Sequence, residues 1–203
     1  MNKAKINLSI KEGFASKHLY EKISILETST IKNIERGMQW VHNFIDDAVL
    51  IGGTSVVNYL KEGRDLTPDV DFLVKDISNL ENKLNTAKLR FSFLRDSNGR
   101  NIGITVPEFN IDFLDAKAGN TSLHQLILKT FNLIMIGGTN LKICNPELLV
   151  IMKFEVGREK DLNDGFKILK AGVINKLTYL NYVNLLKNDL MEYESIKTYV
   201  ELV

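Results

Sequence analysis

Two aspartates separated by one residue are the part of this chain whose type and spacing most directly indicate chemistry. Asp69 and Asp71 open the run Asp-Val-Asp-Phe-Leu-Val, and in an extended strand both carboxylates point to one face while the apolar side chains point to the other. At a separation of about 4 Å the two charges would repel by roughly 4 kcal/mol at an effective dielectric constant of about 20. A divalent cation that prefers oxygen ligands, such as Mg²⁺ or Mn²⁺, relieves this repulsion. A shared proton, or an exposed strand face with two solvated acids, is the alternative interpretation.

A third aspartate, Asp112, lies in a similar setting within the apolar run Phe-Asn-Ile-Asp-Phe-Leu. If its strand neighbours the strand of Asp69 and Asp71, the three carboxylates can join in one cluster. Asp115 is a competing candidate, but its odd spacing from Asp112 directs it to the opposite face or beyond the strand end.

Upstream of these acids, a short apolar strand at 48–51 runs directly into Gly52, Gly53, Thr54 and Ser55. Glycines let backbone N–H groups approach a ligand closely, and the first turn of a helix offers unpaired N–H donors to an anion. Thr54 and Ser55 add hydroxyls that can cap the helix or contact a phosphate. A tight turn with Thr54 as the helix N-cap is the simpler alternative.

The elements that must position these residues follow from apolar periodicity and turn signals. Helices are predicted at 31–44, 54–61 and 77–83, and strands at 48–51, 69–74, 89–94, 102–106, 110–114, 131–136 and 141–143. From Asn145, Pro146 and Glu147 onward the pattern is helical, with a break at Gly172. Residues 1–29 are polar and predict no more than a short surface helix.

This order of elements predicts an α/β (α+β) fold in one small protein of 203 residues. Residues 1–144 would form a mixed-sheet core with flanking helices, in which 1–29 are an N-terminal extension. Residues 145–203 would form a C-terminal helical portion that walls a cleft.

Composition excludes several classes of protein. The formal net charge is +1, so the chain is not a polycation built to coat nucleic acid, and the group Lys88, Arg90, Arg95 and Arg100 is interpreted as a solvated strand face. The single cysteine, Cys144, permits no intrachain disulfide and no multi-cysteine zinc site.

The three histidines (His18, His42 and His124) show no metal-ligand spacing and are interpreted as incidental. The first ten residues contain no apolar signal segment, and no apolar run is long enough to cross a bilayer. We therefore expect a cytoplasmic protein with no membrane partner.

The order of the motifs adds more than each motif alone: a Gly-Gly-Thr turn, an Asp-x-Asp pair about one helix later, and then a strand-borne aspartate. In this order the chain resembles the nucleotidyltransferase superfamily that includes DNA polymerase beta. More narrowly, it resembles prokaryotic nucleotidyltransferase-like proteins related to the AbiEii abortive-infection toxins. The resemblance covers about residues 46–170 and is carried by 50–55, Arg64, Thr67, 69–74, 111–113, 145–149, Lys153, 158–161 and Asp164. Pro68 and a short stretch between Lys153 and Lys160 depart from the family pattern.

The resemblance implies a metal-dependent nucleotidyltransferase with a nucleotidyltransferase-like fold, which moves a nucleoside monophosphate from a nucleoside triphosphate (NTP) to an acceptor hydroxyl. Asp69, Asp71 and Asp112 would be the catalytic residues and the ligands of Mg²⁺ or Mn²⁺, with Asp112 as the proton acceptor. The nucleotide would be bound by Gly52, Gly53, Thr54, Ser55 and Lys153.

The same resemblance suggests a toxin-type enzyme of a toxin–antitoxin or abortive-infection system, with a cognate antitoxin as partner. The acceptor stays open: an RNA end, a protein side chain, an antibiotic and a small metabolite are all chemically suitable.

Lys153 lies in the middle of the apolar helical stretch 149–154, where it could reach a triphosphate across the cleft. It could equally extend along the helix flank into solvent. Lys160 is expected to form ordinary surface ion pairs with Asp161 or Asp164.

Three other interpretations compete with an active transferase. A catalytically inactive relative could serve as a nucleotide-binding or protein-interaction module. A glycosyltransferase also uses an Asp-x-Asp pair, but its pair normally follows a longer nucleotide-binding half than the 68 residues available here. A plain interaction protein, binding through the helices from Glu147 onward, would leave the three acids unexplained.

Overall fold

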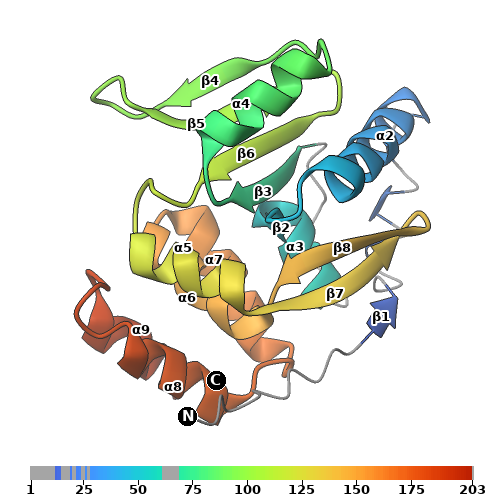
Figure 1. Cartoon of the computed structure of the whole chain (residues 1–203). Helices are drawn as coiled ribbons and strands as arrows, with labels where there is room; N and C mark the ends of the chain where they lie inside the picture. The colour runs from blue at the N-terminus through green and yellow to red at the C-terminus, as the bar shows by residue number, and fades with distance from the viewer. Residues whose placement is uncertain are drawn as a thin grey trace, which may run out of the picture.

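In the described part of the chain, eight strands form a mixed sheet with helices on both faces (Figure 1). The computed structural model describes residues 12–14, 19, 22–23, 26, 28–60 and 69–202. The strands are β1 (Glu12–Phe14), β2 (Val49–Ile51), β3 (Val70–Val74), β4 (Ser92–Arg95), β5 (Asn101–Val106), β6 (Ile111–Asp115), β7 (Phe131–Ile136) and β8 (Thr139–Cys144). Their order across the sheet is β1-β7-β8-β2-β3-β6-β5-β4. The predicted α/β fold with a mixed sheet is therefore confirmed.

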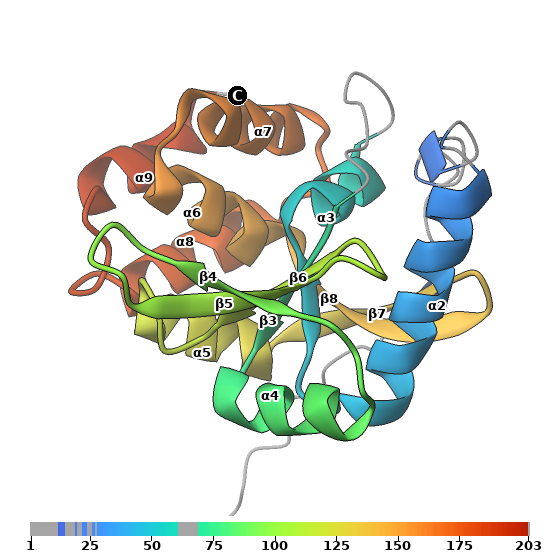
Figure 2. The ribbon, with the colours of Figure 1, turned by 90° about the horizontal axis from the view of Figure 1, so that it is seen from above.

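Helices cover the two faces of the sheet unequally. They are α2 (Thr28–Phe44), α3 (Gly52–Tyr59), α4 (Ile77–Thr86), α5 (Thr121–Lys129), α6 (Pro146–Val156), α7 (Glu159–Lys170), α8 (Lys176–Leu185) and α9 (Tyr193–Tyr199). Apolar side chains of α2 and α4 form one core with the sheet, α5 to α9 contribute to a second core, and α3 contributes to both. Figure 2 shows α6 and α7 on one side of the central strands and α4 on the other.

The alternation in β3 distributes its side chains between the two cores. Val70, Phe72 and Val74 are buried in the core formed with α2 and α4, as the sequence pattern predicts. Leu73 belongs to the opposite core, and Asp71 points to that same face. The strand therefore fixes a carboxylate on the side of α3 and α6 while its apolar face anchors it in the sheet.

The start of α6 follows the local capping signals closely. The side chain of Asn145 accepts a hydrogen bond of 2.9 Å from the N–H of Leu148, and Pro146 occupies the first turn. The helix ends at Gly157, which has φ of 70°. No helix in the described part of the chain is long and apolar enough to cross a membrane.

Two segments differ from the sequence-based expectation. Residues 12–14 pair with β7 as a parallel edge strand, and Leu19 is fully buried, so the polar N-terminal region contributes more than the expected surface helix. Helix α5 was not predicted, although Asn120 caps it and Leu123 is buried beneath it. Arg64, Thr67 and Pro68 lie outside the described residues.

Candidate active site

The sheet register brings the predicted acids together. Strands β3 and β6 are parallel neighbours, and Asp71 and Asp112 are direct register partners. Strand β2 lies on the other side of β3, where Ile51 is the partner of Asp71. Register partners point to the same face of a sheet, so Asp71 and Asp112 stand side by side. Asp69 immediately precedes β3 and is exposed, and all three acids line one cavity.

The carboxylate of Asp71 is held in an unfavourable environment for a negative charge. Burial raises its pKa, and the neighbouring Asp112 carboxylate raises it further, to about 6. A hydrogen bond from the backbone N–H of Gly53 and the positive charge of Lys153 oppose this rise. The site therefore stores electrostatic repulsion that a cation would relieve.

Gly52 is required by the close approach of Asp71 to the first turn of α3. Its φ is +64°, and a Cβ at this position would lie only 1.9 Å from Oδ2 of Asp71. Any larger residue would push the carboxylate away from the helix. The two glycines therefore let the start of α3 and an acid of β3 meet, and both glycines line the cavity.

The two hydroxyl residues that follow have different environments. Ser55 is fully buried, and its Oγ donates a hydrogen bond of 3.0 Å to the carbonyl of Ile51, so the structure places this side chain in the helix and not in the cavity. Thr54 is also buried, but its Oγ1 has no hydrogen-bond partner in the part of the chain that the structure describes. A buried hydroxyl without a partner is costly, which makes Thr54 a candidate for a bond to a ligand.

Lys153 is the centre of a buried ion-pair network between α6 and α7. Its Nζ lies 2.7 Å from Asp161 and 3.4 Å from Asp164, and the side chains of these three residues are at most 9% exposed. Nε of Arg158 lies 2.6 Å from the other oxygen of Asp161. Burial tends to raise the pKa of Asp161, but the bonds from Lys153 and Arg158 hold it below its ordinary value.

This network corrects two sequence-based interpretations. Lys153 does not extend along the helix into solvent, and the prediction that Lys160 would form surface pairs with Asp161 or Asp164 is wrong because both acids are buried. The reason is the close crossing of α6 and α7, in which Gly165 packs against the ring of Phe154.

A cavity of about 1190 Å³ connects these features. Of the predicted residues, Gly52, Gly53, Lys153 and the three acids line it, whereas Thr54 and Ser55 do not. It is also lined by side chains from the β4–β5 turn, the β6–α5 loop, α5 and the α8–α9 loop, namely Asp96, Arg100, Lys117, Asn120, His124, Asp189 and Met191. Sequence reasoning assigned none of them to the site, because their meeting depends on the fold. Asn120 alone carried a local signal, as the cap of α5.

His124 was interpreted as incidental, yet it lines the cavity and is largely enclosed. Burial lowers its pKa, against the effect of the Ala116 and Ala118 carbonyls, which favours the neutral imidazole. Its Nδ1 is buried without a partner among the described residues.

The donor set suits a cation that brings further ligands. Among the described residues, no three His, Cys, Asp or Glu side chains are gathered into a complete metal site. Mg²⁺ commonly binds to one or two carboxylates and completes its coordination with water and substrate phosphates. The Asp71–Asp112 pair, with Asp69 at the cavity mouth, fits a cation held in that way.

Most of the chain matches one family model. The family model described as "Nucleotidyl transferase of unknown function (DUF2204)" matches residues 30–202. Among solved structures, an antigenic nucleotidyltransferase-like protein from Paracoccidioides brasiliensis is 17% identical, with a TM-score of 0.49, covering 93% of this chain and 94% of that chain. No curated protein matches.

Proposed function

The chain belongs to this family of nucleotidyl transferases of unknown function, and on that premise we propose that it transfers a nucleoside monophosphate from an NTP to an acceptor hydroxyl, with Mg²⁺ or Mn²⁺ as cofactor. Family membership confirms the resemblance to the nucleotidyltransferase superfamily. The observation that carries the proposed reaction is the in-register pair Asp71 and Asp112, placed against the Gly52–Gly53 turn in a large cavity.

Different residues along the sheet would bind the metal, bind the phosphates and accept the proton. Asp69, Asp71 and Asp112 would hold the metal, which when bound neutralises charge on the triphosphate and lowers the pKa of the attacking hydroxyl. The backbone N–H groups at the start of α3 would bind phosphate oxygens. Asp112 lies on the side of Asp71 away from β2, where it would accept the proton of the acceptor hydroxyl.

Lys153 would complete the phosphate-binding side of the cavity. Its ammonium group lowers the pKa of Asp71, which supports a role for its charge beside the acid pair. Asp161 and Asp164 hold the side chain in place. A lysine oriented in this way can add a positive charge beside a triphosphate without moving far.

The first prediction concerns binding of metal and nucleotide together. The melting temperature of the protein should rise with an NTP plus Mg²⁺ or Mn²⁺, and much less with either alone, because the phosphates and the acids share the cation. A ligand at 100 times its dissociation constant adds about 2.7 kcal/mol to the free energy of unfolding. Thermal unfolding with each of the four NTPs, with and without metal, measures this. If none of the four stabilises the protein, the inactive interaction module becomes the better interpretation.

The second prediction separates the two neighbouring hydroxyls. Replacing Thr54 by valine should weaken binding of metal–NTP several-fold while leaving stability unchanged or slightly higher, because it removes a buried hydroxyl without a partner. Replacing Ser55 by alanine should cost about 1 kcal/mol of stability and leave binding unchanged, because it removes only the bond to Ile51. Titration calorimetry and urea unfolding of both variants make the comparison. If both variants lose the same affinity for metal–NTP, the Thr54 hydroxyl does not bind the ligand.

A biological role as a toxin-type enzyme rests on the resemblance to AbiEii-related proteins alone. Under that proposal the enzyme would act in the cytoplasm, where NTPs are available, and a cognate antitoxin would be its protein partner.

A further inference from the structure

The strand order separates two approaches to the acid pair. Ile51, Asp71, Asp112 and Thr105 are successive register partners across β2, β3, β6 and β5, so they form one row on the same face of the sheet. The turn that starts α3 lies at the β2–β3 end of this row. A second reactant that reaches Asp112 without displacing the phosphates must therefore approach over β6, β5 and β4.

That part of the sheet presents an open face beside Asp112. Leu114, Gly103 and Leu94 are register partners in β6, β5 and β4, and the two leucines are only partly buried. Gly103 has room for no side chain, since a Cβ there would lie 2.4 Å from the carbonyl oxygen of Phe113. The opposite face of these strands is closed by α4. The cavity extends over the open face, where Leu114 and Asn101 line it.

Positive and negative side chains are distributed unequally between the two ends of the cavity. The α6–α7 end carries three cations, Lys153, Arg158 and Lys160, against the two buried acids Asp161 and Asp164 that pair with them, so its net charge is positive. At the other end, both lining cations are already bound to carboxylates: Arg100 lies 2.7 Å from Asp96, and Lys117 is paired with Asp76. Asp115 also lines the cavity there, and Asn120 of the β6–α5 loop bonds to the carboxylate of Glu155 and to the backbone carbonyl of Asp189, so these two acids lie beside that loop. Phosphate groups would be attracted to the first end and repelled from the second.

We propose that the open face of β6, β5 and β4 binds the acceptor, and that the acceptor is a small cationic or neutral alcohol without phosphate groups. This inference rests on the proposed function. In the reaction the acceptor oxygen forms a bond to the α-phosphorus, the bond from the α-phosphorus to the bridging oxygen breaks, and pyrophosphate leaves. The hydroxyl proton passes to Asp112. The charge distribution makes an RNA end the disfavoured acceptor.

Three alcohols of similar size and different charge test the class of acceptor. They are 2-amino-1,3-propanediol (a cation), glycerol (neutral) and glycerol 3-phosphate (an anion), each supplied at high concentration with Mg²⁺ and labelled NTP. We expect transfer of label to fall in that order, with about tenfold or more between cation and anion. Equal or preferred use of glycerol 3-phosphate, or of an RNA oligonucleotide, would overturn the proposal.

Charge reversal at Asp189 tests whether the wall of the cavity sets this preference. Asp189→Lys should reduce the preference for the cation over the anion about fivefold, since the net charge of the site rises by two. Its side chain is exposed, and only its backbone carbonyl bonds to Asn120, so folding should be unaffected. Asp46→Lys, at an exposed position outside the cavity, is the matched control and should leave the preference unchanged. If Asp189→Lys keeps the preference of the parent protein, this wall of the cavity does not select the acceptor by charge.

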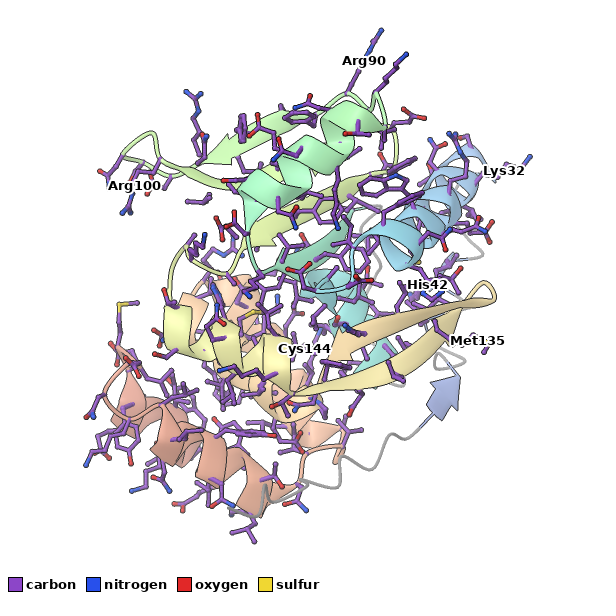
Figure 3. All side chains as sticks on the ribbon, in the orientation of Figure 1. Lys32, His42, Arg90, Arg100, Met135 and Cys144 are labelled. Atoms are coloured by element: carbon purple, nitrogen blue, oxygen red, sulfur yellow. The ribbon has the colours of Figure 1, made fainter. Side chains whose placement is uncertain are left out.

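Blocking the open face with a large side chain tests where the acceptor binds. Asn101→Trp should reduce transfer to all three alcohols about tenfold or more while preserving stabilisation by metal–NTP. Arg90→Trp is the control, because Arg90 is exposed and lies far from Arg100 of the β4–β5 turn (Figure 3). Normal transfer by a folded Asn101→Trp variant would place the acceptor elsewhere.

The outcomes also separate this inference from the proposed function. Metal–NTP binding without transfer to any of the alcohols would overturn the acceptor assignment alone. Loss of metal–NTP binding in the parent protein would remove the proposed function, and this inference with it.

Discussion

Replacing Asp71 by asparagine should abolish metal-dependent NTP binding and, at the same time, make the protein more stable at neutral pH. The carboxylate is disfavoured by burial and by Asp112, so the uncharged amide removes a repulsion while keeping an acceptor for the N–H of Gly53. The pKa of Asp71 rises from 3.8 to about 6 on folding. One pKa unit corresponds to about 1.4 kcal/mol, so the gain in stability should be about 2 to 3 kcal/mol at pH 7.

The pH dependence of this gain follows from the direction of the shift. Between pH 4 and pH 6 the folded protein keeps a proton on Asp71 that the unfolded chain has lost. The contribution of Asp71 to stability is therefore fully present below the unfolded pKa and is lost as the pH rises through about 6. The difference between Asp71→Asn and the parent should be small at pH 4 and reach its full size above pH 6.

Urea unfolding of the metal-free proteins at several pH values measures this difference, and thermal unfolding with metal–NTP measures the loss of binding. Asp69→Asn is the matched control for stability, because Asp69 is exposed and its change should fall within about 0.5 kcal/mol. A less stable Asp71→Asn protein would show that this acid is structural. Retained metal–NTP binding would show that it does not hold the cation.

Replacing Lys153 by methionine should destabilise the protein by about 3 to 5 kcal/mol, the usual cost of breaking a buried ion pair. Methionine fills much of the same space but leaves the carboxylates of Asp161 and Asp164 buried without their cation. Urea unfolding at pH 7 measures the loss. Because Lys153 also lowers the pKa of Asp71, metal–NTP binding should be lost at a higher pH in this variant than in the parent.

Arg158→Ala is the control for Lys153→Met. Arg158 bonds to the same carboxylate, but its side chain is 76% exposed, so its removal should cost less than about 1 kcal/mol. A Lys153→Met protein that loses no more stability than Arg158→Ala would contradict the network. In that case Asp161 and Asp164 would have to reach solvent by a local rearrangement of α7.

The site holds one carboxylate in a position that costs stability, and a buried lysine partly offsets that cost. Asp71 is kept close to Asp112 and to the first turn of α3 although its charge is disfavoured there. The buried network of Lys153 supplies an opposing positive charge from the other wall of the cavity. Such an arrangement is expected where a charged ligand restores the balance of charge on binding.

The sequence by itself determined the features that depend on neighbouring residues. The alternation in 69–74 set which side chains of β3 face the core, and Asn145 with Pro146 set the start of α6. The Gly-Gly pair was equally readable as the junction between a strand and a helix, although α3 begins at Gly52 and not at Thr54. These signals work because strand pleat, helix capping and glycine conformation are decided within a few residues.

Only the tertiary structure decided which of these residues meet. Asp71 and Asp112 are partners because β3 and β6 pair in parallel, a choice that depends on burying both strands together. Asp161 and Asp164 became buried partners of Lys153 because Gly165 lets α7 lie close against α6. Residues 12–14 joined the sheet through β7, and no local pattern could name that partner. Contacts between distant segments are selected by packing of the whole core, and the pattern of a single segment is compatible with many partners.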